Sequence, residues 1–342
     1  MMKIVAGLGS IDEYIPYVQA GADEFFCGYV PANWTEKYGT LQALNRREVM
    51  NVNVQLGAME DLKILKNMMD CYGVPVKLTF NSLFYSNEQY KEVAEIIERC
   101  MNMGFSTFII ADPALIVYLR QQGIRNCRIH LSGEMSEINS LFLKDMAQFD
   151  IERVIFHRKN TISEMKSCIA QCKNQIPEYE AFMLNELCHF TGAYCNSLHC
   201  DELCHLCHVP YELGTYDETE QKTEGKLVVA EETFLEDAEI YVTGATGCGL
   251  CSLYQLEQAG VTHLKIVGRG NYVDCERQDI AQLKKALNIL EEIKENRENQ
   301  SCISQMPCSD RGYERDECNS MRFKERIQEE LFHGKCSKNC YY

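Results

Sequence analysis

Residues 3–30 read KIVAGLGSIDEYIPYVQAGADEFFCGYV and contain a strand, a helix and a second strand in that order. The runs 3–9 and 23–30 are short, apolar and rich in β-branched and aromatic residues, which is typical of buried strands. Residues 11–21 between them have helical spacing and end at Gly21, a common helix terminator. Two strands joined through a helix pair in parallel by a right-handed crossover. This stretch therefore predicts an α/β fold.

The same alternation continues along most of the chain. Helical spacing is found at 57–72, at 87–104, after the Asp112-Pro113 pair, at 252–260 and from Asp279 to about Arg297. Further strands are predicted at 74–80, 106–112, 127–132, 152–158, 180–185 and 262–268. Eight strands alternating with helices predict a (β/α)8 TIM-like barrel, regular or irregular. An open doubly wound sheet is the alternative, because periodicity does not separate the two.

The predicted domain organisation follows from changes in composition. Residues 1–297 form the barrel and include a cysteine-rich segment at 186–251, and residues 298–342 form a polar, cysteine-bearing tail. The tail cysteines indicate either a second metal site or a thiol-rich extension, and they are Cys302, Cys308, Cys318, Cys336 and Cys340.

Charge and cysteine usage limit the classes of function. Asp and Glu number 50 against 34 Lys and Arg, a formal net charge of −16 that disfavours bulk nucleic-acid binding. We expect a cytoplasmic protein with no membrane association, because we find neither a signal peptide nor an apolar run of the ~20 residues that cross a bilayer. Cytoplasmic thiols stay reduced, so 19 cysteines indicate metal ligands and free thiols, and a strongly reducing or anaerobic host.

The cysteines are concentrated in two places. ELCHFTGAYCNSLHCDELCHLC (186–207) holds five, and GCGLC (247–251) holds two more. Thiolates gathered in this way hold zinc or an iron–sulfur cluster. The C-x2-C pairs Cys204/Cys207 and Cys248/Cys251 are typical of zinc ribbons, so the spacing leaves both metals open.

Basic residues are predicted at the site of chemistry. In a barrel this site lies at the carboxyl ends of the strands, and Arg46, Arg47, Arg158 and Arg269 all follow predicted strands. Guanidinium groups there would bind a small anionic substrate bidentately. Arg46 and Arg47 are equally well explained as a helix-start pair that faces water.

Several motifs resemble one known family. EAFMLNELCHFTGAYC (180–195), CHLCHVPYEL (204–213) and GLCSLYQLEQAGVTHLKIVGRGN (249–271) resemble consecutive signature elements of the collagenase-like peptidases of family U32. The opening strand–helix–strand and the stretches 111–123 and 128–140 are similar to other parts of the same module. The resemblance runs from about Lys3 to Asn271.

The resemblance implies an activity and a cofactor. Some members of the family are oxygen-independent hydroxylation proteins with a 4Fe–4S cluster, which act in anaerobic ubiquinone synthesis or on transfer or ribosomal RNA, with prephenate implied as hydroxyl donor. It implies Cys188, Cys195, Cys207 and Cys251 as the cluster ligands, with Cys204 as a substitute for Cys207. Asn185 stands where the family usually has Gly.

We therefore expect an iron–sulfur enzyme, hydroxylase-like, that acts on a small anionic molecule or a modified RNA base, with a paralogous subunit as a candidate partner. RNA is the weaker substrate because the chain is acidic. The alternatives are a peptidase, as the family name suggests, and a non-catalytic zinc-binding module.

Overall fold

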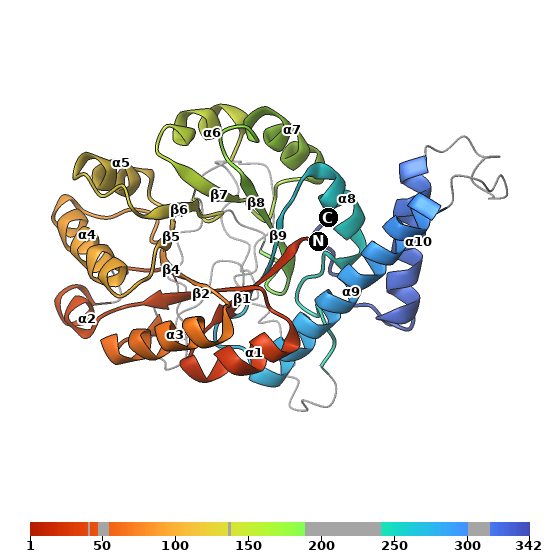
Figure 1. Ribbon diagram of the computed structural model, residues 1–342, viewed down its shortest axis with the longest axis horizontal. Helices are drawn as coiled ribbons and strands as arrows, with labels where there is room; N and C mark the ends of the chain where they lie inside the picture. Colours follow the sequence, from red (N-terminus) through yellow and green to blue (C-terminus); the bar gives the residue numbers. More distant parts are fainter. Residues whose placement is uncertain (40–41, 47–54, 136–137, 189–240, 300–314) are drawn as a thin grey trace, which may run out of the picture.

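The structure, a computed structural model, describes residues 1–39, 42–46, 55–135, 138–188, 241–299 and 315–342. Eight parallel strands form a closed barrel, as Figure 1 shows. In spatial order they are β1 (Lys3–Leu8), β2 (Glu24–Tyr29), β4 (Val76–Phe80), β5 (Thr107–Ile110), β6 (Arg128–Leu131), β7 (Ile151–Ile155), β8 (Glu178–Leu184) and β9 (His263–Ile266).

The barrel closes where the last strand pairs with the first. Ile4 of β1 is in register with Leu264 of β9, and Val5 of β1 is in register with Glu24 of β2. The eight strands predicted from the sequence are thus confirmed, and the open doubly wound alternative is wrong. A two-residue strand, β3 (Gln55–Leu56), pairs in parallel with the carboxyl end of β2 and was not predicted.

Helices surround the barrel (Figure 1). They are α1 (Tyr14–Ala20, after the 3-10 turn η1, Ile11–Glu13), α2 (Ala32–Tyr38), α3 (Met59–Tyr72), α4 (Asn87–Asn102), α5 (Pro113–Gln121), α6 (Ser140–Ala147), α7 (Ile162–Cys172) and α8 (Leu253–Ala259, after the 3-10 turn η5, Leu250–Ser252), followed by α9 (Val273–Asn299) and α10 (Arg315–Glu330). In the described part of the chain, no helix is both long enough and apolar enough to span a bilayer.

The expected helices are present, and all but one of them begin and end within three residues of the predicted boundaries. Asp112 caps α5 as predicted, and its Oδ1 accepts a hydrogen bond of 2.8 Å from the Ala114 N–H. Helix α9 begins at Val273, six residues before the predicted start at Asp279. The early start brings Glu276 and Asp279, both fully buried, onto one helical face.

Helix α10 lies in the segment that we predicted as a polar tail. It packs against α8, α9 and η5, with Phe323 and Ile327 fully buried. These two apolar side chains, four residues apart, form a narrow apolar stripe. In the sequence this stripe is difficult to recognise as a helix signal, because the residues around it are polar. The division of the chain at residue 297 stays a prediction, but the described tail residues lie against the barrel.

The barrel interior is layered. Near the amino ends of the strands, Arg153 is buried among three glutamates, with its nitrogens 2.8 Å from Glu24, 2.7 Å from Glu178 and 2.8 Å from Glu180. Lys77 also lies 2.8 Å from Glu24. The next layer is apolar and consists of Val5, Phe26, Ile109, Ile155, Phe182 and Val267. Polar and charged side chains return above it, at the carboxyl ends of the strands.

Candidate functional site

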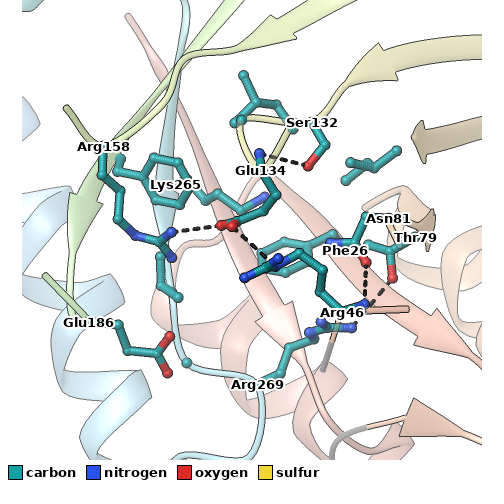
Figure 2. Close-up of a pocket in the computed structure, with 16 residues that line it drawn as sticks. Phe26, Arg46, Thr79, Asn81, Ser132, Glu134, Arg158, Glu186, Lys265 and Arg269 are labelled. Carbon is teal, nitrogen blue, oxygen red and sulfur yellow. Dashed lines mark hydrogen bonds and ion pairs between the residues drawn. The ribbon is translucent and has the colours of Figure 1, made fainter. Parts of the chain in front are cut away.

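A cavity opens at the carboxyl ends of the strands, above the apolar layer (Figure 2). Its volume is about 70 Å³. The side chains that line it come from seven strands or the loops that follow them, and they are Phe26, Arg46, Thr79, Asn81, Ile109, Ser132, Gly133, Glu134, Ile155, Arg158, Phe182, Glu186, Lys265, Val267, Gly268 and Arg269. We call this the arginine pocket.

Two of its arginines are held by one carboxylate. Arg158 Nη1 lies 2.6 Å from Glu134 Oε1, and Arg46 Nε lies 3.3 Å from Glu134 Oε2. Figure 2 shows the two guanidinium groups reaching Glu134 from different sides. The Arg158 guanidinium also lies over the Phe182 ring, 4.1 Å from its centroid. These contacts hold both guanidinium groups at the pocket wall with their charges facing the cavity.

The third arginine reaches across the barrel mouth. Arg269 Nη1 donates to Gln55 Oε1 at 3.2 Å and to Thr79 Oγ1 at 3.4 Å. A Cβ at Gly7 or Gly28 would lie 2.8 Å from the Arg269 side chain. The glycines of β1 and β2 therefore make the room that this arginine needs.

One basic residue of the pocket was missed by the sequence analysis. Lys265 Nζ lies 3.2 Å from Glu180 and 3.7 Å from the centroid of the Phe26 ring. Burial lowers the pKa of Lys265 from its ordinary value, although Glu180 opposes the shift. The signal was available, because Lys265, Val267 and Arg269 alternate at the period of a strand.

Three of the four predicted substrate-binding residues, Arg46, Arg158 and Arg269, are brought together in the arginine pocket. The fourth, Arg47, lies outside the described residues. The pocket has four basic side chains and two acidic ones, Glu134 and Glu186, so its formal charge is positive within a chain of −16. The geometry suits a small anion with an apolar body.

Of the four predicted metal ligands, Cys188 and Cys251 are described and half-buried. Their segments are hydrogen-bonded to each other, because the N–H of Asn185 donates to Gly247 O at 2.8 Å and that of Leu187 donates to Thr246 O at 2.9 Å. Cys195 and Cys207 lie outside the described residues, as do Cys200 and Cys204.

Cys188 lines a second, larger cavity of about 640 Å³, which shares Arg158 with the arginine pocket. We call it the thiol cavity. Its other lining residues are Lys159, Asn160, Thr161, Ile162, Leu187, Tyr341 and Tyr342. Two of them belong to the predicted tail.

The tail cysteines have different positions. Cys340 forms a parallel β-bridge with Cys248, while Cys336 is partly buried against the core. Cys318 lies on α10, and Cys302 and Cys308 are outside the described residues. Beside them, Gln328 of α10 donates to the Cys251 sulfur at 3.1 Å. Whether the tail binds a second metal stays a prediction.

Asn185, at the end of β8, adopts a left-handed backbone conformation with φ 66°, and Glu186 follows with φ 50°. Residues other than Gly, Asn or Asp are strained in this left-handed conformation. The Asn185 Nδ2 donates at 2.6 Å to Asp279 Oδ2, which also accepts from the Tyr241 hydroxyl at 2.6 Å. Asn185 thus takes a glycine-like conformation and adds a bond to a buried carboxylate.

The chain is similar to one known family over most of its length. The family described as "Peptidase family U32" matches residues 9–315. The tRNA hydroxylation protein P of Haemophilus influenzae is 30% identical over 111 residues, and that of Escherichia coli K12 is 29% identical over the same length. Each alignment covers 32% of this chain and 23% of the relative, so the chain matches about a quarter of those relatives' length.

Solved structures give weaker similarities. A structure described as the U32 peptidase Mk0906 aligns with a TM-score of 0.40 at 9% identity, over 54% of this chain and 69% of that one. A dihydrodipicolinate synthase from Bacillus clausii aligns with a TM-score of 0.44 at 11% identity, over 98% of this chain and 82% of that one.

Proposed function

Since the chain belongs to peptidase family U32, we propose that it is an iron–sulfur enzyme of the hydroxylase-like type, with a small anionic molecule bound in the arginine pocket. The observation that carries the proposal is the gathering of Arg46, Arg158, Lys265 and Arg269 above an apolar layer, next to the cavity of Cys188. The relatives named for tRNA hydroxylation support a hydroxylation. They also make tRNA the first acceptor to test.

The described residues fit a thiolate-bound cluster. Cys188 follows β8, and Cys251 precedes α8. Their segments are adjacent and hydrogen-bonded to each other, so both cysteines can contribute ligands at the barrel mouth. Cys195 and Cys207 would complete the set, with Cys204 as the substitute for Cys207. When bound, such a cluster supplies one-electron transfer.

The protein's own residues bind and orient the anion. Arg46 and Arg158, held by Glu134, offer guanidinium donors from one side, and Arg269 offers them from the other. Phe26 and Phe182 contact the apolar part of the ligand. Burial of these charges strengthens their interaction with a carboxylate relative to that in water.

The test is anaerobic purification followed by analysis of iron and sulfide. We expect a brown protein with about four irons and four sulfides per chain. The Cys188→Ala variant should lose both the colour and the bound iron and sulfide. The matched control is Cys71→Ala, because Cys71 is exposed on α3. A colourless protein loaded with zinc would contradict the proposal and favour the zinc-binding module.

Activity is tested with the same preparation. Hydroxylation of tRNA supplied with a cyclic dicarboxylate such as prephenate should be seen by nucleoside mass spectrometry and should be abolished in Arg269→Ala. Cleavage of peptides that survives Cys188→Ala, with no hydroxylated nucleoside, would favour the peptidase alternative.

A further inference from the structure

The thiol cavity, which meets the arginine pocket at Arg158, is bordered by a segment outside the region that matches the family. That match ends at residue 315, whereas residues 336–342 lie at the barrel mouth. The backbone of this segment pairs with Cys248 through an isolated β-bridge, since the Cys248 N–H donates to Asn339 O at 2.8 Å and the Tyr341 N–H donates to Cys248 O at 2.9 Å.

Side chains fasten the segment further. Ser337 Oγ donates to Gly244 O at 2.9 Å, and Asn339 Nδ2 donates to Ala245 O at 2.6 Å. The Tyr342 hydroxyl donates to Phe182 O at 2.8 Å. The segment is therefore a built part of the barrel mouth.

Two glycines make room for its tyrosine rings. A Cβ at Gly247 would lie 3.1 Å from Tyr341 Cε2, and a Cβ at Gly249 would lie 3.2 Å from Tyr342 Cε2. Both distances are tighter than about nine in ten real Cβ contacts. The glycines on either side of Cys248 thus form the seat for the two rings.

Tyr341 contacts residues of both cavities. Its ring packs against the apolar layer that contains Phe26, Ile155 and Phe182, all of which line the arginine pocket. The same residue lines the thiol cavity. Its hydroxyl donates to Asn185 O and is also hydrogen-bonded to Arg158, the side chain that both cavities share.

We propose that Tyr341 is a specificity-determining residue, whose ring is the wall between the arginine pocket and the thiol cavity and so limits the size of the bound anion. The identity of the ligand as an anion rests on the proposed function. The inference that the Tyr341 ring separates the two cavities rests only on the packing of Tyr341. Removal of the ring would join the small pocket to a cavity of about 640 Å³.

The first test measures anion selectivity on the full-length protein with its metal bound. Succinate is the small dicarboxylate and phthalate the bulky one, and calorimetry gives the affinity for each. We expect Tyr341→Ala to raise the ratio of phthalate to succinate affinity about tenfold, or 1.4 kcal/mol. Tyr341→Phe keeps the ring and should leave the ratio as it is, as should Tyr272→Ala, an exposed tyrosine. An unchanged ratio in Tyr341→Ala overturns the proposal.

A second measurement does not depend on an anion site. Phenylglyoxal modifies accessible arginines, and peptide mass spectrometry reports each one separately. Arg158 should react at least about tenfold faster in Tyr341→Ala than in the wild type or Tyr341→Phe. The exposed Arg128 should react equally in all of them, and the buried Arg153 should stay unmodified if the variant is folded.

The two measurements separate the possible failures. If the wild type binds neither dicarboxylate, the anion site of the proposed function fails, and labelling of Arg158 alone decides whether Tyr341 is the wall. Equal labelling of Arg158 in all variants overturns the wall. If Arg153 becomes labelled in Tyr341→Ala, the smaller change Tyr341→Leu replaces it, and the same two outcomes apply.

Discussion

Asn185 shows how one residue can meet two requirements at the site. The chain must turn sharply after β8 to bring Glu186 to the arginine pocket and Cys188 to the thiol cavity, and the turn needs a positive φ. Glycine would meet that need, and Asn meets it with an additional hydrogen bond to the buried Asp279. The departure from the family pattern is thus compatible with the same backbone path.

Replacement of Asn185 should separate the two contributions. Asn185→Gly keeps the conformation and loses the bond to Asp279, which should cost about 1–2 kcal/mol of the free energy of unfolding. Asn185→Ala loses the bond and adds left-handed strain, so it should cost about 1 kcal/mol more. Urea unfolding of both variants measures the difference, and an alanine variant as stable as the glycine variant would contradict this explanation.

At the scale of elements, α10 connects the helical layer to the mouth. It packs on α8, α9 and η5. The segment after it runs to Cys248 and to the two glycines that make room for the rings of Tyr341 and Tyr342. Its anchors, Phe323 and Ile327, are fully buried while most of its other side chains are polar. The docking of α10 therefore fixes where residues 336–342 begin.

Loss of an α10 anchor should loosen the helix and the segment together. Phe323→Ala should destabilise by about 3–5 kcal/mol, because it leaves a large cavity under the helix. Hydrogen exchange should then accelerate in α10 and in residues 336–342 more than in β5 or β6. Met321→Ala is the matched control, because Met321 is on the same helix and 41% exposed. Faster exchange confined to α10 would show that the segment is held without the helix.

At the scale of the whole molecule, the barrel is held by a buried charge network as well as by apolar packing. Arg153 of β7 joins glutamates of β2 and β8, and Glu24 also binds Lys77 of β4. The carboxylate of Glu24 has a strongly lowered pKa, because hydrogen bonds and charges from His263, Arg153 and Lys77 outweigh its burial. Strands distant in sequence are thereby linked inside the barrel.

Removal of the central cation should be costly. Arg153→Met removes the buried cation that Glu24 and Glu180 share, which should lower the free energy of unfolding by about 3–5 kcal/mol. Arg128→Met breaks an ion pair whose arginine side chain is 57% exposed, so it should cost less than about 1 kcal/mol. Denaturant unfolding compares the two, and equal losses would show that the network contributes little.

By itself, the sequence determined the strand–helix alternation, the eight strands and the arginines that follow them, because local periodicity and chain direction carry this information. It did not predict β3, α2, α6, α7 or α10, whose short or narrow apolar patterns are weak local signals. Only the tertiary structure decided that the barrel closes, since strand pairing between Ile4 and Leu264 joins residues far apart in the chain. It alone also paired Lys265 with Glu180 and placed Tyr341 on Gly247, because local periodicity can show which face of a strand a residue is on but not which distant segment it packs against.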